Sequence, residues 1–311
     1  ATAYKIPNAT EGLIKLEEIK HNRSSGMQGL VYNTRREIFK DKAVRQALAY
    51  AFDFEWSNKN LFYEQYTRTR SYFDNSELAA TGLPSQDELA ILEPYRGKIP
   101  DEVFTKEYNP PKNEVPGKIR ESLRTATKIL KDAGWVIKDK KLVNTKTGAD
   151  LKFEILLSSP ISERIILPFV KNLERLGIKA SVRTIDTSQY RRRLDTHDFD
   201  MIIGVFGQSM SPGNEQRSFW GTKAADLEGG RNLIGIKDPV IDALIEKIIS
   251  APSREDLVIA VKAMDRVLQW SHWLIPQFHA NFDRIAYWDK FGRPNITPSQ
   301  GNQFVSWWVD A

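Results

Sequence analysis

The feature that most constrains the fold is an alternation of apolar, strand-like runs with amphipathic, helix-like runs in the middle of the chain. The strand-like runs are Leu151–Leu157, Ile178–Ile185 and Phe199–Phe206. Helices are predicted between them over Ser162–Leu176, where Pro168 indicates a kink, and over Ser188–Thr196. Strands joined by helices of these lengths form βαβ units, so the pattern predicts an α/β fold with a mixed, largely parallel sheet.

Further elements are predicted on both sides of this alternation. Met27–Thr34 has the β-branched and aromatic composition of a strand, and Asp41 is placed to cap the helix that follows it. The other expected elements are a helix at Ser57–Tyr66, a helix from Ile119 to Gly134, a hairpin at Trp135–Val143, helices at Pro239–Ser250 and Ser253–Trp270, and an aromatic, strand-like end at Leu274–Trp308.

Residues 67–117 break this regular pattern. The stretch shows little periodicity and contains Pro84, Pro94, Pro100, Pro110, Pro111 and Pro116. Long irregular stretches of this kind are usually functional loops. We therefore expect a functional loop or a segment that wraps around the rest of the domain.

The composition excludes several kinds of chemistry. The 311 residues include no cysteine, which rules out thiolate metal ligands, cysteine nucleophiles and disulfides. The net charge is +5, with charges of opposite sign interleaved as in Lys15–Lys20, and this favours a solvated surface over a nucleic-acid-binding patch. No run of 18 apolar residues occurs. The chain opens on Ala-Thr-Ala-Tyr without an initiator Met, as expected of a mature or trimmed product.

No motif indicates an enzyme. His21, His197, His272 and His279 form no zinc-hydrolase pattern, and His279 is interpreted as a polar residue on a strand face. A G-x-S-x-G elbow, a P-loop and a G-x-G-x-x-G fingerprint are all missing, and we interpret Lys146-Thr-Gly148 as a chance match in a polar turn. We therefore predict no catalytic residues, no metal site and no cofactor, and a hydrolase is the disfavoured alternative.

The most promising candidate site is the loop Gly207–Asn214. It follows a predicted parallel strand at its carboxyl end, where α/β sheets bind ligands. Its glycines allow close approach of backbone, and Gln208, Ser209 and Ser211 offer polar groups. An ordinary crossover loop is the alternative interpretation. The run Arg191–Arg193 is interpreted as a solvated helix face, with an arginine turned inward to hold a carboxylate or phosphate as its alternative.

Several motifs, in one order along the chain, resemble the family 5 extracellular solute-binding proteins. These proteins are the dipeptide, oligopeptide and nickel binders of ABC importers. The motifs are Met27–Arg36, Phe39–Leu48, Ala80–Ser85, Ile129–Trp135, Leu176–Ile178, Asp198–Met201, Asp238–Asp242 and Leu274–Pro276. Asp53–Trp56, Phe62–Tyr63 and Ser211–Gln216 narrow the resemblance to the YejA-like branch, which is associated with peptides and peptide-type antibiotics such as microcin C.

The resemblance implies a lobe of the type II periplasmic-binding-protein kind (family 5, cluster C), together with part of the other lobe. Residues 1–30 would be a linker and part of lobe I, residues 31–273 lobe II, and residues 274–311 the return to lobe I. The chain would be the carboxyl-terminal half of a periplasmic protein whose signal peptide lies in the other half. Its partners would be a peptide or peptide-like ligand, the permease subunits and the amino-terminal half, with no nucleic acid.

The resemblance also implies which residues face the ligand. They are Met27, Gln28, Tyr66, Phe206, Gly207, Gln208, Ser209, Met210, Ser211 and Glu215. Related binders carry a Trp where Phe206 stands and an acid that binds the peptide α-ammonium where Ser209 stands. A neutral hydroxyl cannot make that charge-assisted bond, so we hypothesise that Glu215 compensates. The alternative ligands are an oligosaccharide, for which aromatic walls would suit, and a metal chelate.

Overall fold

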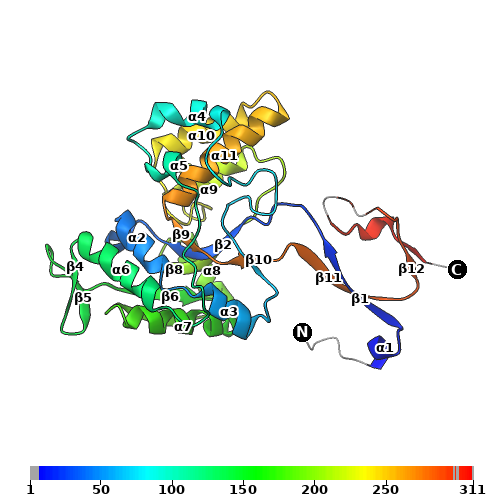
Figure 1. The fold of residues 1–311 in the computed structure, drawn as a ribbon, viewed down its shortest axis with the longest axis horizontal. Helices are drawn as coiled ribbons and strands as arrows, with labels where there is room; N and C mark the ends of the chain where they lie inside the picture. Colours follow the sequence, from blue (N-terminus) through cyan, green and yellow to red (C-terminus); the bar gives the residue numbers. More distant parts are fainter. Residues whose placement is uncertain (1–6, 297, 299–300, 310–311) are drawn as a thin grey trace.

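The fold consists of an α/β body and a strand ribbon that projects from it (Figure 1). The computed structural model describes residues 7–296, 298 and 301–309. Within these residues, no helix is both long and apolar enough to cross a membrane.

A five-stranded sheet forms the centre of the body, in the order β7-β6-β8-β2-β9. The strands are β7 (Lys179–Thr184), β6 (Lys152–Leu157), β8 (Met201–Phe206), β2 (Met27–Tyr32) and β9 (Leu274–Pro276). Strands β7, β6 and β8 are parallel, whereas β2 runs antiparallel to both β8 and β9. The predicted mixed sheet is confirmed. Its parallel part coincides with the βαβ alternation, because parallel neighbours need a crossover helix.

Helices cover one face of the sheet and the hairpin extends this layer. They are α2 (Lys42–Ala49), α3 (Phe54–Leu61), α6 (Arg120–Asp132) and α7 (Glu163–Glu174), and the hairpin is β4 (Trp135–Lys138) with β5 (Lys141–Asn144). Asp41 caps α2 as predicted, since its carboxylate accepts a hydrogen bond from the amide of Ala43. Leu30, Ile155 and Met201 point into the core beneath this layer.

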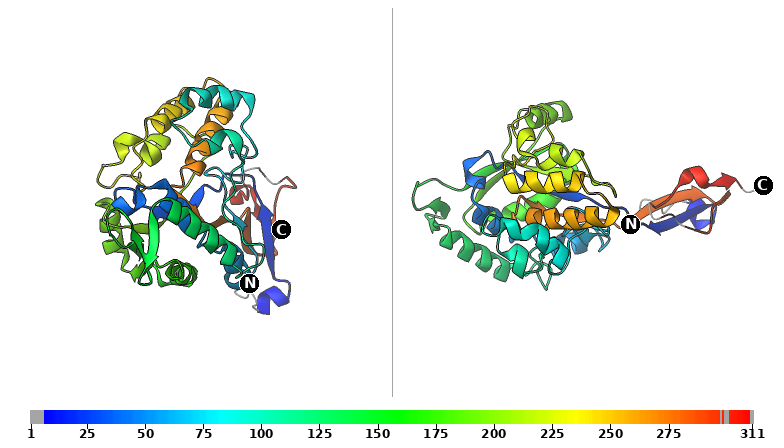
Figure 2. Two further views of the ribbon diagram at one scale, coloured as in Figure 1. Left: turned by 60° about the vertical axis from the view of Figure 1, so that its left-hand side comes forward. Right: turned by 90° about the horizontal axis from the view of Figure 1, so that it is seen from above.

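The opposite face is covered by a second helical layer. Its members are α4 (Gln86–Leu92), α5 (Glu102–Thr105), α8 (Thr187–Asp195), α9 (Glu215–Trp220), α10 (Pro239–Ile249) and α11 (Arg254–Trp270). Val31, Leu156 and Ile202 belong to this second core. Each is the immediate neighbour of a residue in the first core, because successive side chains of a strand point to opposite faces. The left-hand view of Figure 2 shows helices above and below the sheet.

Residues 67–117 wrap the second layer, and they contain more regular structure than predicted. They include β3 (Thr67–Arg68) and the helices α4 and α5. Ser85 caps α4, and the buried Asp265 of α11 accepts hydrogen bonds from Ser71, Tyr72 and Ala80. These long-range contacts order a segment whose prolines obscure its periodicity.

Helix α3 begins and ends earlier than the predicted Ser57–Tyr66. The Asp53 side chain accepts a hydrogen bond from the amide of Trp56 and starts the helix at Phe54. Tyr63 and Glu64 have positive φ angles of 55° and 61°, which end it. A capping residue and a left-handed turn therefore override the apolar periodicity there.

The ribbon joins the two ends of the described chain. Strand β1 (Ile14–Lys20) pairs antiparallel with β11 (Phe282–Trp288), and it is preceded by α1 (Pro7–Thr10). Beyond β11 lie β12 (Phe291–Gly292) and β13 (Trp308–Val309), which pair with each other. The short β10 (Phe278–His279) pairs with β3 at the root of the ribbon. The lobe boundaries at residues 31 and 273 stay a prediction, and β2 and β9 carry the body's sheet a few residues past both of them.

Candidate ligand-binding site

A pocket of about 400 Å³ opens where the ribbon meets the body. We call it the junction pocket. It is lined by His21, Arg23, Ser24, Ser25, Gln28, Tyr66, Val205, Phe278, His279 and Ala280. Its volume lies within the roughly 300–1,000 Å³ typical of ligand sites, and its lining combines apolar and polar groups as such sites do.

Strand alternation decides which residues of β2 and β8 reach the junction pocket. Gln28 and Val205 are opposite each other in the antiparallel register, and both line it. Met27 and Phe206, one position along, point to the other face and are each only 1% exposed. The ring of Phe206 packs against Phe219 and Trp220, with centroid distances of 5.8 and 4.7 Å.

Aromatic rings form one wall of the pocket. The ring centroid of Phe278 lies 4.8 Å from that of Tyr66 and 4.6 Å from that of Phe62. Phe54 stacks behind Phe278 at 6.3 Å. Because each ring is held by another, the wall is a preformed surface for an apolar side chain or ring of a ligand.

Polar side chains form the other wall. Asn75 donates from Nδ2 to the carbonyl oxygens of His21 and Arg23, at 3.0 Å each, and lies 3.3 Å from Nδ1 of His21. Nδ1 of His279 is 3.0 Å from the hydroxyl of Thr69. Burial lowers the pKa of both imidazoles, so both are neutral at pH 7. Arg23 is ion-paired with Asp283 of β11.

The predicted loop after β8 is held mainly by its own side chains. Gln208 Oε1 accepts a hydrogen bond from Nε2 of Gln216 at 2.7 Å, and Ser209 accepts one from the amide of Ser211 at 3.1 Å. Glu215 accepts from the amide of Gly213 at 2.9 Å. The carbonyl of Met210 accepts from Arg254, which also pairs with Glu77.

This loop borders the junction pocket without lining it. Gly26 has a φ of +64°, and a Cβ at that position would lie 2.4 Å from the carbonyl oxygen of Phe206 and 3.1 Å from Cα of Gly207. The segment that carries Ser24 and Ser25 therefore touches the start of the loop. Of the predicted ligand-facing residues, Gln28 and Tyr66 line the pocket. Gly207–Ser211 and Glu215 lie in or beside the bordering loop. Met27 and Phe206 are buried on the opposite face of the sheet.

Sequence reasoning missed most of the polar wall. His21, Arg23 and His279 come from segments more than 250 residues apart, and only the pairing of β1 with β11 and of β3 with β10 brings them together. The signal that was available is the alternation of β8, which assigns Val205 and Phe206 to opposite faces.

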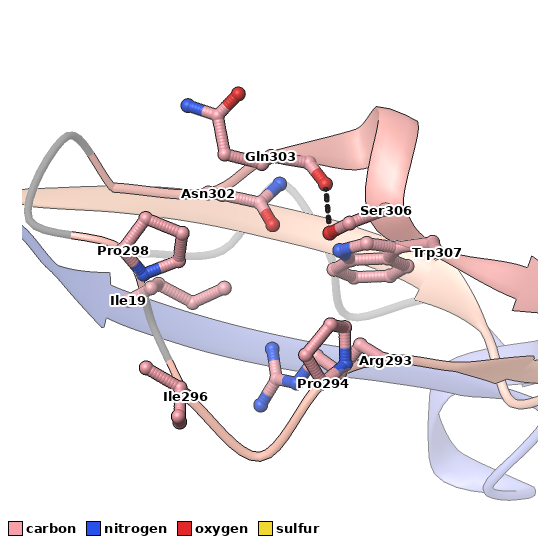
Figure 3. Close-up of a pocket in the computed structure, with 9 residues that line it drawn as sticks. All are labelled: Ile19, Arg293, Pro294, Ile296, Pro298, Asn302, Gln303, Ser306 and Trp307. Carbon is pink, nitrogen blue, oxygen red and sulfur yellow. Dashed lines mark hydrogen bonds between the residues drawn. The ribbon is translucent and has the colours of Figure 1, made fainter.

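Other candidate features belong to the structure of the fold. Arg193 pairs with Glu154 at 2.9 Å and Arg191 with Asp195 at 2.9 Å, so both bind carboxylates of their own chain. Across residues 7–296, 298 and 301–309, no group of three or more His, Asp or Glu side chains is arranged to hold a metal ion. A hollow in the ribbon, shown in Figure 3 with the Ser306 to Gln303 hydrogen bond, measures about 20 Å³. That is room for about one water molecule.

A pocket with an aromatic wall and a polar wall, beside a sheet end, has the features typical of small-molecule binding sites. Residues 3–227 match the family "Bacterial extracellular solute-binding proteins, family 5 Middle". The chain therefore belongs to family 5 of the bacterial extracellular solute-binding proteins, which confirms the resemblance drawn from its motifs.

Curated relatives confirm the YejA-like character. The chain is 47% identical to the uncharacterized protein y4wM of Sinorhizobium fredii, over 99% of this chain and 47% of that protein. It is 46% identical to the probable peptide-binding protein YejA of Agrobacterium fabrum, over 99% of this chain and 50% of that protein. It is 38% identical to the uncharacterized protein YejA of Escherichia coli, over 100% of this chain and 51% of that protein. The chain thus spans about half the length of these relatives.

Solved structures confirm the fold. The oligopeptide-binding protein AppA of Bacillus subtilis, in complex with a nonapeptide, aligns with a TM-score of 0.71 at 18% identity, over 100% of this chain and 54% of its own. NikZ of Campylobacter jejuni, in complex with Ni(L-His), aligns with a TM-score of 0.70 at 18% identity, over 96% of this chain and 54% of its own. Both support the predicted periplasmic-binding-protein architecture.

Proposed function

We propose that this chain is part of a substrate-binding protein of an ABC importer that captures peptides or peptide-like compounds and delivers them to a membrane permease. The protein acts in the periplasm and carries out no catalysis. Its ligand is held between two lobes, of which the α/β body is one. Closure of the lobes around the ligand presents the loaded protein to the permease.

The observation that carries this proposal is the place of the junction pocket. It lies at the root of the ribbon, where the body meets the part of the chain proposed to lead into the other lobe. A ligand bound there contacts the body through Gln28 and Tyr66, and it meets the loop Gly207–Ser211 at the border of the pocket. Met27, Phe206 and Glu215 hold these groups in position.

Names of relatives favour peptides as the ligand class. One relative is called a probable peptide-binding protein, and a second Agrobacterium fabrum relative, 38% identical over 98% of this chain and 50% of its own length, is called a peptidoglycan-binding protein. Microcin C-type compounds are a subset of the same class. The alternatives are an oligosaccharide and a metal chelate.

Native mass spectrometry of the full-length protein tests the proposal. The protein is mixed with an equimolar pool of di- to nonapeptides, a pool of hexaoses and Ni(L-His), and the bound mass is identified. Retention of peptides at micromolar or lower concentration supports the proposal. Retention of only an oligosaccharide or only the nickel complex would show that the ligand belongs to that class and not to the peptides. Retention of none of the three would contradict the proposed peptide-binding function.

A further inference from the structure

We propose that residues 118–150, which we call the basic end, bind the surface of an anionic phospholipid bilayer. The basic end consists of α6, the β4–β5 hairpin and the residues that flank them. It lies at the end of the molecule away from the ribbon, at whose root the junction pocket opens, as Figure 1 and the right-hand view of Figure 2 show. A membrane contact there goes beyond the proposed function and does not depend on which ligand the pocket takes.

Positive charge is concentrated at the basic end. Residues 118–150 depart from the interleaving of charges seen at Lys15–Lys20, because they contain nine Lys and Arg against four Asp and Glu. Their net charge of +5 equals that of the whole chain. All nine basic side chains are exposed. Within the described chain, two of the nine form ion pairs, Arg124 with Glu121 and Lys141 with Asp150, and the other seven have no acidic partner within ion-pair distance.

The spacing of α6 gathers its bases on one flank of the helix. Arg120, Arg124 and Lys131 are four and seven residues apart, which places them on one face. Lys131 also lines an apolar groove of about 200 Å³ between α6 and the hairpin. The acids Glu121 and Asp132 lie together on the other flank, roughly 90° around the helix axis. The bases therefore follow the edge of an apolar groove, with the acids turned away from it.

The tip of the hairpin carries three lysines in positions that do not stabilise it. Lys138 and Lys141 are directly opposite each other in the antiparallel register, where like charges repel. Asp139 and Lys140 form the turn, with φ angles of 50° and 63°, and glycine is the favoured residue at the second position of such a turn. Contact with an anionic surface would relieve the repulsion, and a lysine in the turn supplies a charge to that surface that glycine could not.

Apolar side chains complete this surface. Val136 and Ile137 are 39% and 52% exposed, and they directly precede Lys138 in β4. Both border the groove, which is also lined by the buried Trp135 and Leu142. Exposed apolar groups beside clustered lysines are the combination that binds anionic lipid, because ammonium groups contact the phosphates while apolar groups enter the headgroup region.

The type of basic residue favours a bilayer over an acidic protein or a nucleic acid. Seven of the nine bases are lysines, whose flexible ammonium groups act as point charges without the directional fork of arginine. Such groups suit the diffuse array of phosphates on a fluid surface. Trp135 is only 6% exposed, so it offers no face on which a nucleic-acid base could stack. A salt-sensitive contact of this kind keeps the protein near the membrane and leaves the junction pocket free for its ligand.

Vesicle flotation with the full-length protein tests the proposal. Vesicles of phosphatidylcholine that contain about a quarter phosphatidylglycerol are compared with vesicles of phosphatidylcholine alone. The protein should bind the anionic vesicles at about 50 mM NaCl and bind at least about tenfold more weakly at about 300 mM, because salt screens exposed charges. It should not bind the vesicles that lack phosphatidylglycerol.

Substitutions locate the surface. Lys138→Glu combined with Lys140→Glu should weaken binding to the anionic vesicles at least about tenfold. Lys223→Glu combined with Lys247→Glu is the matched control, since both lysines are exposed beside the second helical layer and the net charge changes equally. Binding by this control should stay within about threefold of that by the unaltered protein. Thermal unfolding checks that each variant folds.

Two outcomes would overturn the proposal. No binding to the anionic vesicles at about 50 mM NaCl would leave the basic end to an acidic protein partner. Equal weakening by the two charge reversals would mean that net charge, and not the basic end, attracts the vesicles. Calorimetry should show unchanged peptide affinity in Lys138→Glu combined with Lys140→Glu, so the membrane contact can fail while the proposed peptide-binding function stands.

Discussion

Gln28 and Val205 face each other across the antiparallel pair of β2 and β8, and both side chains line the junction pocket. The next pair in the same register, Met27 and Phe206, lies on the opposite face and is almost fully buried. A one-residue step along two strands thus separates pocket-lining side chains from core side chains. This relationship leads to opposite expectations for substitutions at neighbouring positions.

Val205→Trp should fill the junction pocket and weaken peptide binding at least about tenfold. Val205 is 63% exposed, so the free energy of unfolding should change by less than about 0.5 kcal/mol. Ile137→Trp, on the distant β4–β5 hairpin and also exposed, is the control and should bind normally. Unchanged affinity in Val205→Trp would place the ligand outside the pocket. Calorimetry and urea unfolding measure the two quantities.

Phe206→Ala should instead destabilise the fold, by about 3–5 kcal/mol, because it leaves a cavity against Phe219 and Trp220. Phe304→Ala is the matched control, since that ring is exposed on the ribbon. Urea unfolding of both variants provides the comparison. A loss below about 1 kcal/mol for Phe206→Ala would contradict the packing described for β8.

Gly26→Ala should cost about 3 kcal/mol or more and displace the loop after β8, because the new Cβ would overlap the carbonyl oxygen of Phe206. Gly12→Ala separates this overlap from backbone strain. Gly12 has a similar φ of +78° with no atom within 4 Å of the added Cβ, so about 1–2 kcal/mol is expected there. Similar losses in the two variants would mean that contact with the loop contributes nothing.

Arg45→Lys should destabilise the protein by about 2–4 kcal/mol. The Arg45 guanidinium is buried and donates to the carbonyls of Phe39, Lys40, Ser271 and His272, at 2.7–3.1 Å. It thereby joins the start of α2 to the end of α11, and an ammonium cannot reach all four acceptors. Thermal unfolding of the variants measures this change. Arg120→Lys, at an exposed position, is the control and should change the free energy of unfolding by less than about 0.5 kcal/mol.

The free energy of unfolding should fall as the pH rises from about 4 to about 7, because of the buried carboxyl group of Asp265. Burial raises the pKa of its carboxyl from 3.8 to about 7. The folded state then holds a proton that the unfolded state has released, so this contribution is complete below pH 4 and is lost as the pH rises through 7.

The comparison of urea unfolding at pH 4.5 and pH 7.5 checks this sign. In the unaltered protein, the free energy of unfolding should be a few kcal/mol lower at pH 7.5 than at pH 4.5. Asp265→Asn should remove this difference, and the exposed Asp132→Asn variant should keep it. Identical pH profiles for the two variants would mean that Asp265 is ionised throughout in the folded protein.

Local sequence determined most of the secondary structure and the family of this protein. The βαβ alternation, the Asp41 cap and the β4–β5 hairpin follow from the spacing and type of residues that are neighbours in the chain. Such signals act over a few residues, because helix and strand periods and caps are local. Where a cap and a pair of positive φ angles disagreed with the apolar period, as in α3, the local geometry decided the helix ends.

Tertiary structure alone decided the candidate site. The antiparallel register of β2 on β8 assigns Gln28 and Val205 to the pocket and Met27 and Phe206 to the core. The contacts of Asn75 with His21 and of Thr69 with His279 join residues 54 and 210 positions apart. No local period encodes such pairs. They form only when the two strands of the ribbon meet and the sheet is packed on both faces, since the register that buries the most apolar surface also selects which polar groups remain at its edge.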